Sequence, residues 1–296
     1  MSITTSQQIQ RFYSQYKDTE VTFTKEIIRA IRLIPSQVYF KSLGHHWPCI
    51  IYSTSMTQTR IIATLNESFY EQAKKSGNII QIRYAFQHES KSNPFTYFIA
   101  AKVTGFSPYG KTDKDINFIS ASYTQRPPDS FIDVIGTILD ANVSSAQRKE
   151  ERVVVTPDVA EMIGLKAKET MVFIDQVPRK CLIRDISFGG AKIILMGIGK
   201  FLVNKPAAIR LFFDEAVSFT EINGSITRCE EVSGRKDITA LAIKFDDKVP
   251  MQYKLKLNEF FKRQKVRKLV IREAPADDHK NNPGPAPKNT PDPTGM

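Results

Sequence analysis

Apolar residues follow two different spacings along the chain, and each spacing predicts a different kind of element. Between residues 6 and 34, apolar positions such as Ile9, Phe12 and Tyr16 are three or four residues apart, which is typical of amphipathic helices. One or two helices are therefore expected there. From residue 37 to 139, short runs rich in β-branched and aromatic residues alternate with turn-prone segments, which predicts strands. These runs are VYFKSL, PCIIYST, RIIATL, NIIQIRYAF, FTYFIAAKVTGF, INFISASY and FIDVIGTIL.

A polar segment separates this region from a second β-rich region. Residues 140–151, DANVSSAQRKEE, contain Val143 as their one large apolar residue and are interpreted as a flexible linker. After the run that begins at Arg152, Thr156 and Pro157 resemble a helix start, so a short helix is expected over residues 159–165. Further strands are predicted over VFIDQV, CLIRDIS, AKIILM, AAIRLFF, FTEINGSITRCEEV and ITALAIKF.

The end of the chain changes character twice. Residues 251–272 mix apolar residues with many lysines and arginines, which predicts a basic closing helix. After Glu273 the sequence is rich in Pro, Asn and Gly and is expected to be disordered. We therefore predict a mainly β protein with two β-barrel domains. Residues 1–142 would form the first with its leading helices, 143–273 the second with its closing helix, and 274–296 a tail.

Charge and cysteine usage narrow the function. The 296 residues carry a formal net charge of +11, which favours anionic partners such as a phosphorylated ligand, nucleic acid or an acidic membrane surface. Three cysteines without CxxC spacing argue against a disulfide framework or a zinc module, and buried free thiols are expected. The chain start lacks a secretory pattern, and no run is apolar for about 18 residues, so a cytoplasmic protein without a membrane span is expected.

Two short segments carry residues suited to a phosphorylated ligand. Arg148 and Arg152 are four residues apart, and each guanidinium is a planar fork that matches phosphate oxygens and can stack on a purine. Asp185 and Ser187 occupy alternate positions of a predicted strand and should therefore point to the same side. Asp185 could accept from a guanine edge or hold an arginine. Two glycines, Gly189 and Gly190, then permit a tight turn where the backbone comes close to a ligand.

The combination RxxxR followed by DxSxxG, flanked by strands, resembles the signature of PilZ domains, which bind cyclic di-GMP. The resemblance covers about residues 143–265 and includes Gln147 before the first arginine and Ala191 after the glycines. It implies that the arginines bind the phosphates and guanine faces, while Asp185 and Ser187 bind guanine edges or phosphate. It departs from the family at Ala242 and Pro206, where many relatives have Gly, which puts barrel geometry in question.

The whole chain resembles two-domain PilZ receptors of the flagellar-brake and spirochaete types, in which a PilZ-like barrel precedes the PilZ domain. The first half has no RxxxR and DxSxxG pair, so a second ligand site is not expected there. The resemblance implies a receptor without catalytic activity or cofactor. Ligand binding would order the linker, change the interdomain arrangement and signal to an unknown protein effector in motility or a related process.

Other readings remain open. A nucleic-acid-binding β-barrel protein could use the basic closing helix, through Lys262, Arg263, Lys265, Arg267, Lys268 and Arg272, although a solvated helix face is the simpler interpretation. His45 and His46 lack further ligands at metal spacing and are expected in a surface turn. The aromatic residues Phe86, Phe95, Tyr97 and Phe98 could stack bases, but core positions are expected. No GxSxG, Walker, HExxH or dinucleotide motif supports an enzyme.

Overall fold

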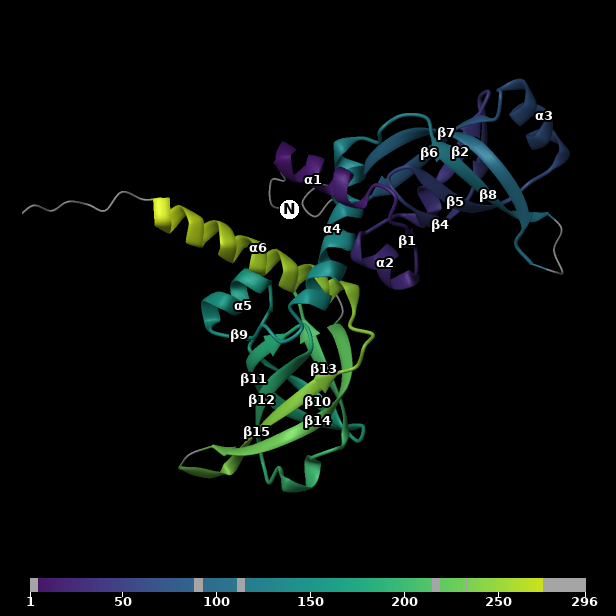
Figure 1. Ribbon diagram of the computed structural model, residues 1–296. Coiled ribbons are helices and arrows are strands. Elements are labelled where there is room, and N and C mark those ends of the chain that lie inside the picture. Colours follow the sequence, from purple (N-terminus) through teal and green to yellow (C-terminus); the bar gives the residue numbers. More distant parts are fainter. Residues whose placement is uncertain (1–4, 88–92, 111–114, 215–218, 233, 274–296) are drawn as a thin grey trace, which may run out of the picture. The chain divides into compact units, whose positions relative to one another are not determined.

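The computed structural model describes residues 5–87, 93–110, 115–214, 219–232 and 234–273 (Figure 1). One compact unit, Met1–Phe260, contains both β-rich regions, and a second begins at Phe261 in the last helix. Where one or two helices were predicted at the start, the structure has two, α1 (Ser6–Tyr16) and α2 (Lys25–Ala30). Each begins at a threonine whose side chain accepts a backbone N–H, because Ser and Thr satisfy the unpaired donors of a first helical turn.

The first β-rich region is an eight-stranded antiparallel sheet. Its strand order is β1-β4-β5-β8-β7-β6-β2-β3. Its core contains the large aromatic side chains Phe12, Phe40, Tyr84 and Phe131, which are all fully buried. The strands are β1 (Val21–Thr22), β2 (Tyr39–Ser42), β3 (His45–Pro48), β4 (Ile50–Thr54), β5 (Gln58–Thr64), β6 (Ile79–Phe86), β7 (Phe95–Pro108) and β8 (Ile116–Tyr123), with a 3-10 turn, η1 (Pro35–Gln37), before β2.

Two segments of this region differ from the sequence prediction. FIDVIGTIL was predicted as a strand but lies in helix α4 (Asp129–Gln147). Its apolar residues at 131, 132, 135, 138 and 139 have helical spacing, which a short apolar run conceals. The prediction of a flexible linker was also wrong for residues 140–147, because these residues continue helix α4, in which Asp140 and Ala141 are buried. Helix α3 (Glu67–Lys75) was not predicted; it buries Phe69 and Ala73 alone and is otherwise polar or exposed.

Side chains in this sheet bear on two further expectations, one for the histidines and one for the aromatic residues. His45 and His46 lie in strand β3 rather than in a turn; both are exposed, whereas Trp47 is buried and stacks on Phe40. Phe86 and Tyr97 are buried as predicted, and Phe95 is half-buried. Phe98 is not in the core: 43% of it is exposed, with the Lys41 ammonium 4.5 Å from its ring centroid. Alternation along β7 places Phe98 on the face opposite Tyr97.

The second β-rich region is a closed barrel. Its strand order is β10-β13-β14-β15-β12-β11-β9, and pairing between β10 and β11 closes six strands. The barrel forms with Pro206 at the start of β13 and Ala242 within β15, the two departures from the family pattern. The strands are β9 (Val153–Val154), β10 (Glu169–Ile174), β11 (Val177–Ser187), β12 (Gly190–Met196), β13 (Pro206–Phe212), β14 (Phe219–Val232) and β15 (Arg235–Phe245).

Helices and turns of this region largely follow the sequence. The short helix α5 (Pro157–Ile163) begins at Thr156, whose hydroxyl accepts from the Val159 amide, and the closing helix α6 spans Met251–Glu273. VFIDQV is not one strand. Asp175 and Gln176 both have positive φ angles and form the two-residue turn between β10 and β11, because such a turn matches the twist of a hairpin.

The remaining global expectations concern cysteines, membranes and the tail. All three cysteines are free thiols; Cys49 and Cys181 are buried and Cys229 is half-buried. Within the described ranges, no helix is long and apolar enough to cross a lipid bilayer. The predicted disordered tail, residues 274–296, lies outside the residues that the structure describes.

Candidate functional site

The turn between β11 and β12 is held by its own side chains and backbone. Ser187, the last residue of β11, pairs with Gly190, the first of β12. The Ser187 hydroxyl donates to the Gly190 carbonyl at 3.3 Å and accepts the Gly189 amide at 3.3 Å. Because Ser187 is 1% exposed, its side chain serves mainly to shape the turn.

Both glycines of the turn are required by close backbone approaches. A Cβ atom on Gly190 would stand 2.4 Å from the Ile243 carbonyl oxygen on neighbouring strand β15. One on Gly189 would stand 2.7 Å from Cγ and 2.9 Å from the carbonyl oxygen of Lys149. Gly190 therefore lets two strands of the barrel pair, whereas Gly189 lets the segment containing the two arginines lie against the turn.

The segment from Arg148 to Arg152, here called the arginine segment, is anchored to that turn. Arg148 is the C-cap residue of helix α4, and its amide donates to the Ser144 carbonyl at 2.9 Å. The Lys149 carbonyl accepts from the Gly189 amide at 2.9 Å. Strand β9 then begins at Val153 and pairs with Ile186 of β11. The expectation of a flexible stretch is thus wrong here, since a helix end, a backbone hydrogen bond and a strand fix the segment on both sides.

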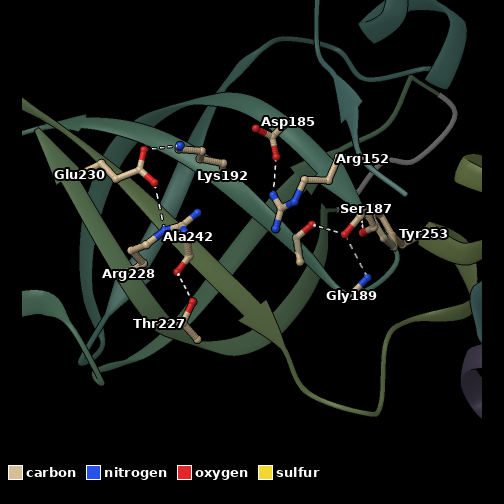
Figure 2. A network of polar contacts seen from close by, with 11 residues as sticks. Arg152, Asp185, Ser187, Gly189, Lys192, Thr227, Arg228, Glu230, Ala242 and Tyr253 are labelled. Atoms are coloured by element: carbon tan, nitrogen blue, oxygen red, sulfur yellow. Dashed lines mark hydrogen bonds and ion pairs between the residues drawn. The ribbon is translucent and has the colours of Figure 1, made fainter. Parts of the chain in front are cut away.

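Arg152 and Asp185 form the ion pair at the centre of the site (Figure 2). Arg152 Nη1 donates to Asp185 Oδ1. The Asp185 side chain is 12% exposed and that of Arg152 is 42% exposed, so the carboxylate is largely buried and the guanidinium reaches the surface. A β-bulge in β11 between Ile183 and Asp185 precedes the pair, and such bulges commonly redirect side chains beside functional sites.

Lys192 lies opposite Asp185 in the strand register, but another carboxylate engages it. Its ammonium group binds Glu230 Oε2, and this hydrogen bond lowers the pKa of Glu230 (Figure 2). Glu230 also forms an ion pair with Arg228, whose Nε is 3.0 Å from Glu230 Oε1. Lys192 thus pairs with Glu230, while Asp185 pairs with Arg152.

The site also includes a residue that sequence reasoning missed. Tyr253 of α6 is 1% exposed, and its hydroxyl donates to the Ser187 carbonyl at 2.7 Å. Burial raises the pKa of this hydroxyl, which keeps it a donor. The spacing of Tyr253, Leu257 and Phe260 marks a buried side of the helix, but it gives no sign of the hydroxyl's partner.

The structure therefore brings Arg152, Asp185, Ser187, Gly189 and Gly190 together. Arg148 lies on the same segment, with its Nε 3.8 Å from Glu151 Oε2. Gln147 is the last residue of α4, and within the described part of the chain its side chain makes no hydrogen bond. The assembled groups are a surface guanidinium, a buried carboxylate and a tight glycine turn, which together suit a ligand that carries both phosphate and hydrogen-bonding base edges.

Comparisons with known proteins identify the two regions separately. A PilZN3 domain matches residues 7–142, and a PilZ domain matches residues 146–263. A protein of Treponema denticola named "Cyclic di-GMP binding protein" is 44% identical over 262 residues, covering 88% of this chain and 83% of that protein.

Solved structures show weaker similarity. The PlzA protein of Borreliella burgdorferi in complex with c-di-GMP is 23% identical, with 86% of this chain and 99% of that chain covered and a TM-score of 0.39. YcgR of Escherichia coli in complex with c-di-GMP is 10% identical, with 84% and 91% covered and a TM-score of 0.27. The assignment therefore rests on the sequence matches, and on that basis the chain belongs to the two-domain PilZ proteins, in which a PilZN3 domain precedes a PilZ domain.

Proposed function

We propose that this protein is a receptor for cyclic di-GMP, with its ligand site at the arginine segment and the β11–β12 turn. The observation that carries the proposal is the Arg152–Asp185 pair beside the turn from Ser187 to Gly190. The name of the Treponema denticola relative supports the same ligand. The residues of the RxxxR and DxSxxG motifs come from two separate segments of the sequence. Binding of one ligand by both motifs would explain why the fold brings the two segments together.

Arg152 is suited to bind phosphate while its position is held by Asp185. A guanidinium has five N–H donors, and the bond to Asp185 uses Nη1, which leaves donors on Nε and Nη2 for phosphate oxygens. The 42% exposed side chain also presents a planar face on which a guanine can stack. Arg148, at the end of α4, would supply the second guanidinium to the same dianion.

The turn would recognise the guanine. The Asp185 carboxylate can accept from the N1 and N2 edge of guanine with the oxygen that does not bind Arg152. Ser187 would act by keeping the Gly189 amide in place, and Gly189 would act by letting the arginine segment lie against the turn. Gln147 would contact the ligand from the end of α4.

We further propose that ligand binding is transmitted through helix α4. Arg148 is the C-cap residue of this helix, so a ligand that binds the Arg148 guanidinium would act directly on the position of the helix end. The output would be a changed interdomain arrangement that signals to a protein effector, in motility or a related process. Small-angle scattering with and without saturating ligand tests this step, and superimposable profiles would exclude it while leaving binding intact.

The binding proposal is tested by calorimetric titration with cyclic di-GMP, cyclic di-AMP and GTP. We expect saturable binding of cyclic di-GMP alone, and recovery of the ligand intact, as befits a receptor without catalytic activity. Arg148→Ala and Arg152→Ala should each weaken binding by about tenfold to a hundredfold, since each loses charge-assisted hydrogen bonds. Arg179→Ala, an exposed arginine of the same barrel, is the matched control. Unchanged affinity in both site variants would refute the assignment.

Nucleic-acid binding through α6 is the second candidate, and the observation that favours it is that Lys262, Arg263 and Lys265 lie on a continuous helix. Neutralising these three cations should abolish a strongly salt-dependent affinity for DNA or RNA, while Arg152→Ala should leave it unchanged. Equal affinity in the neutralised variant would exclude this use of the helix.

A further inference from the structure

The PilZ barrel carries three strongly exposed apolar side chains at the end of β12 opposite Gly190. Met196 is 76% exposed, Ile198 is 69% exposed and Phe201 is 80% exposed. All three lie within six residues of sequence, in the last residue of β12 and the loop with the 3-10 turn η2 (Lys200–Leu202). We call these three residues the apolar tip. Isolated apolar residues are common on protein surfaces, but three together at such exposure indicate a surface for a partner.

The backbone that carries the apolar tip is fixed rather than loose. The Gly197 amide donates to the Asp237 carbonyl at 2.8 Å, and its carbonyl accepts from the Thr239 hydroxyl at 2.6 Å. A Cβ on Gly199 would stand 2.2 Å from Thr239 Cγ2 and 2.5 Å from Cys229 Sγ, so the loop lies tightly against the barrel. The fold therefore holds these side chains outward, whereas a loose loop could fold them away from water.

An exposed cation, Arg179, lies beside the apolar tip, and the next residue of its strand is also a cation. Arg179 Nη1 would be 3.9 Å from a Cβ on Gly197, which places this guanidinium beside the tip. Lys180 follows Arg179 on the exposed start of β11, and in the described part of the chain neither residue makes an ion pair. Three acidic side chains at this end of the barrel are paired with cations: Asp175 with Lys205, Glu231 with Lys200 and Asp237 with Arg235.

We infer that the apolar tip is a membrane-docking element for an anionic lipid surface. Narrow, protruding apolar side chains can enter the soft boundary between headgroups and acyl chains, while adjacent Arg and Lys side chains attract anionic headgroups. The net charge of +11 favours the same surface. Arg179 and Lys180 would contact headgroups, and Met196, Ile198 and Phe201 would enter the boundary below them. This role is independent of the ligand site, which lies at the other end of β12.

Vesicle co-sedimentation of the full-length protein tests the inference. The probes are vesicles of equal parts phosphatidylglycerol and phosphatidylcholine, and vesicles of phosphatidylcholine alone. We expect binding to the anionic vesicles, reduced by at least about tenfold in Ile198→Ser/Phe201→Ser, because each buried apolar side chain contributes to partitioning. Arg179→Glu/Lys180→Glu should lose the preference for anionic vesicles. Leu43→Ser, a 58% exposed residue of the PilZN3 region, is the matched control and should bind as wild type.

A second measurement places the contact. Trp47 is the one tryptophan of the chain and is buried, so Phe201→Trp adds a separable fluorescence signal. Its emission should shift to shorter wavelength with anionic vesicles. Unchanged emission, or wild-type vesicle binding by the Ile198→Ser/Phe201→Ser variant, would overturn the inference. A lipid-free self-association that disappears in that same variant would also overturn it, by assigning the tip to a contact between copies of the chain.

Discussion

Gly189 and Gly190 are adjacent, yet the same substitution should affect different properties of the protein. In Gly190→Ala, the new Cβ would stand 2.4 Å from the Ile243 carbonyl oxygen, which belongs to a paired strand and cannot move alone. Strands β12 and β15 must separate. Overpacking of this kind costs about 1–3 kcal/mol, so we expect a barrel that is less stable by that amount.

In Gly189→Ala, the new Cβ meets Cγ and the carbonyl oxygen of Lys149 at 2.7 and 2.9 Å. The obstacle is the arginine segment rather than a barrel strand, so the segment should move away. Losing the bond from the Gly189 amide to Lys149 costs about 1 kcal/mol, partly offset by the lower chain entropy of alanine in the unfolded state. Stability should change by less than about 1 kcal/mol, while cyclic di-GMP affinity falls about tenfold to a hundredfold as the guanidinium contacts are displaced.

Urea unfolding followed by circular dichroism measures stability, and calorimetry measures affinity. Trp47 fluorescence reports the PilZN3 sheet separately, since it is the one tryptophan. Gly105→Ala is the matched control, because a Cβ there would have no neighbour within 4 Å. Gly190→Ala as stable as wild type, or Gly189→Ala binding no more weakly than Gly105→Ala, would refute the division of roles between the two glycines.

Three further predictions follow from the site and the core. Tyr253→Phe removes the buried hydroxyl that donates to Ser187 at 2.7 Å and should lower stability by about 1 kcal/mol in urea unfolding, whereas Tyr109→Phe, on an exposed residue, should change nothing. Burial raises the pKa of Tyr84, Tyr123 and Tyr253, so above about pH 10 these tyrosines ionise in the unfolded chain before they ionise in the native state. The unfolded chain then holds fewer protons than the native state, and the free energy of unfolding should fall as the pH rises. A free energy of unfolding that does not change above about pH 10 would contradict the burial of these hydroxyls. Cys49 and Cys181 are buried, which raises the pKa of each thiol to about 12, whereas Cys229 is half-buried with a pKa that burial also raises. A thiol reagent near pH 8 should therefore label Cys229 first because it is the most accessible, and equal labelling of all three would contradict this.

The sequence predicted most strands because short β-branched runs bounded by turn residues constrain them locally. FTEINGSITRCEEV corresponds to the whole of β14, Phe219–Val232. The failures occurred where local patterns are ambiguous. FIDVIGTIL is apolar enough to be a buried strand. It is helical because it belongs to the longer helix α4, whose apolar side chains are buried in the core of the first region. Helix α3 has two buried apolar residues, too few for a pattern.

The sequence predicted which residues form the site, but it did not predict how they are arranged. The RxxxR and DxSxxG spacing named Arg152, Asp185, Ser187 and the glycines, which lie together. Tyr253 was missed because its hydroxyl acts across 66 residues on a backbone carbonyl, which has no side-chain signature. The pairing of Lys192 with Glu230 likewise depends on strand register rather than on a motif.

The structure of the protein with cyclic di-GMP bound tests the central claim most directly. We predict that the Arg148 and Arg152 guanidinium groups lie within hydrogen-bonding distance of the phosphates or stack on guanine, with Asp185 at a guanine edge or still bound to Arg152. A ligand bound elsewhere on the chain, with Arg152 and Asp185 paired and the arginine segment without ligand contact, would contradict the account.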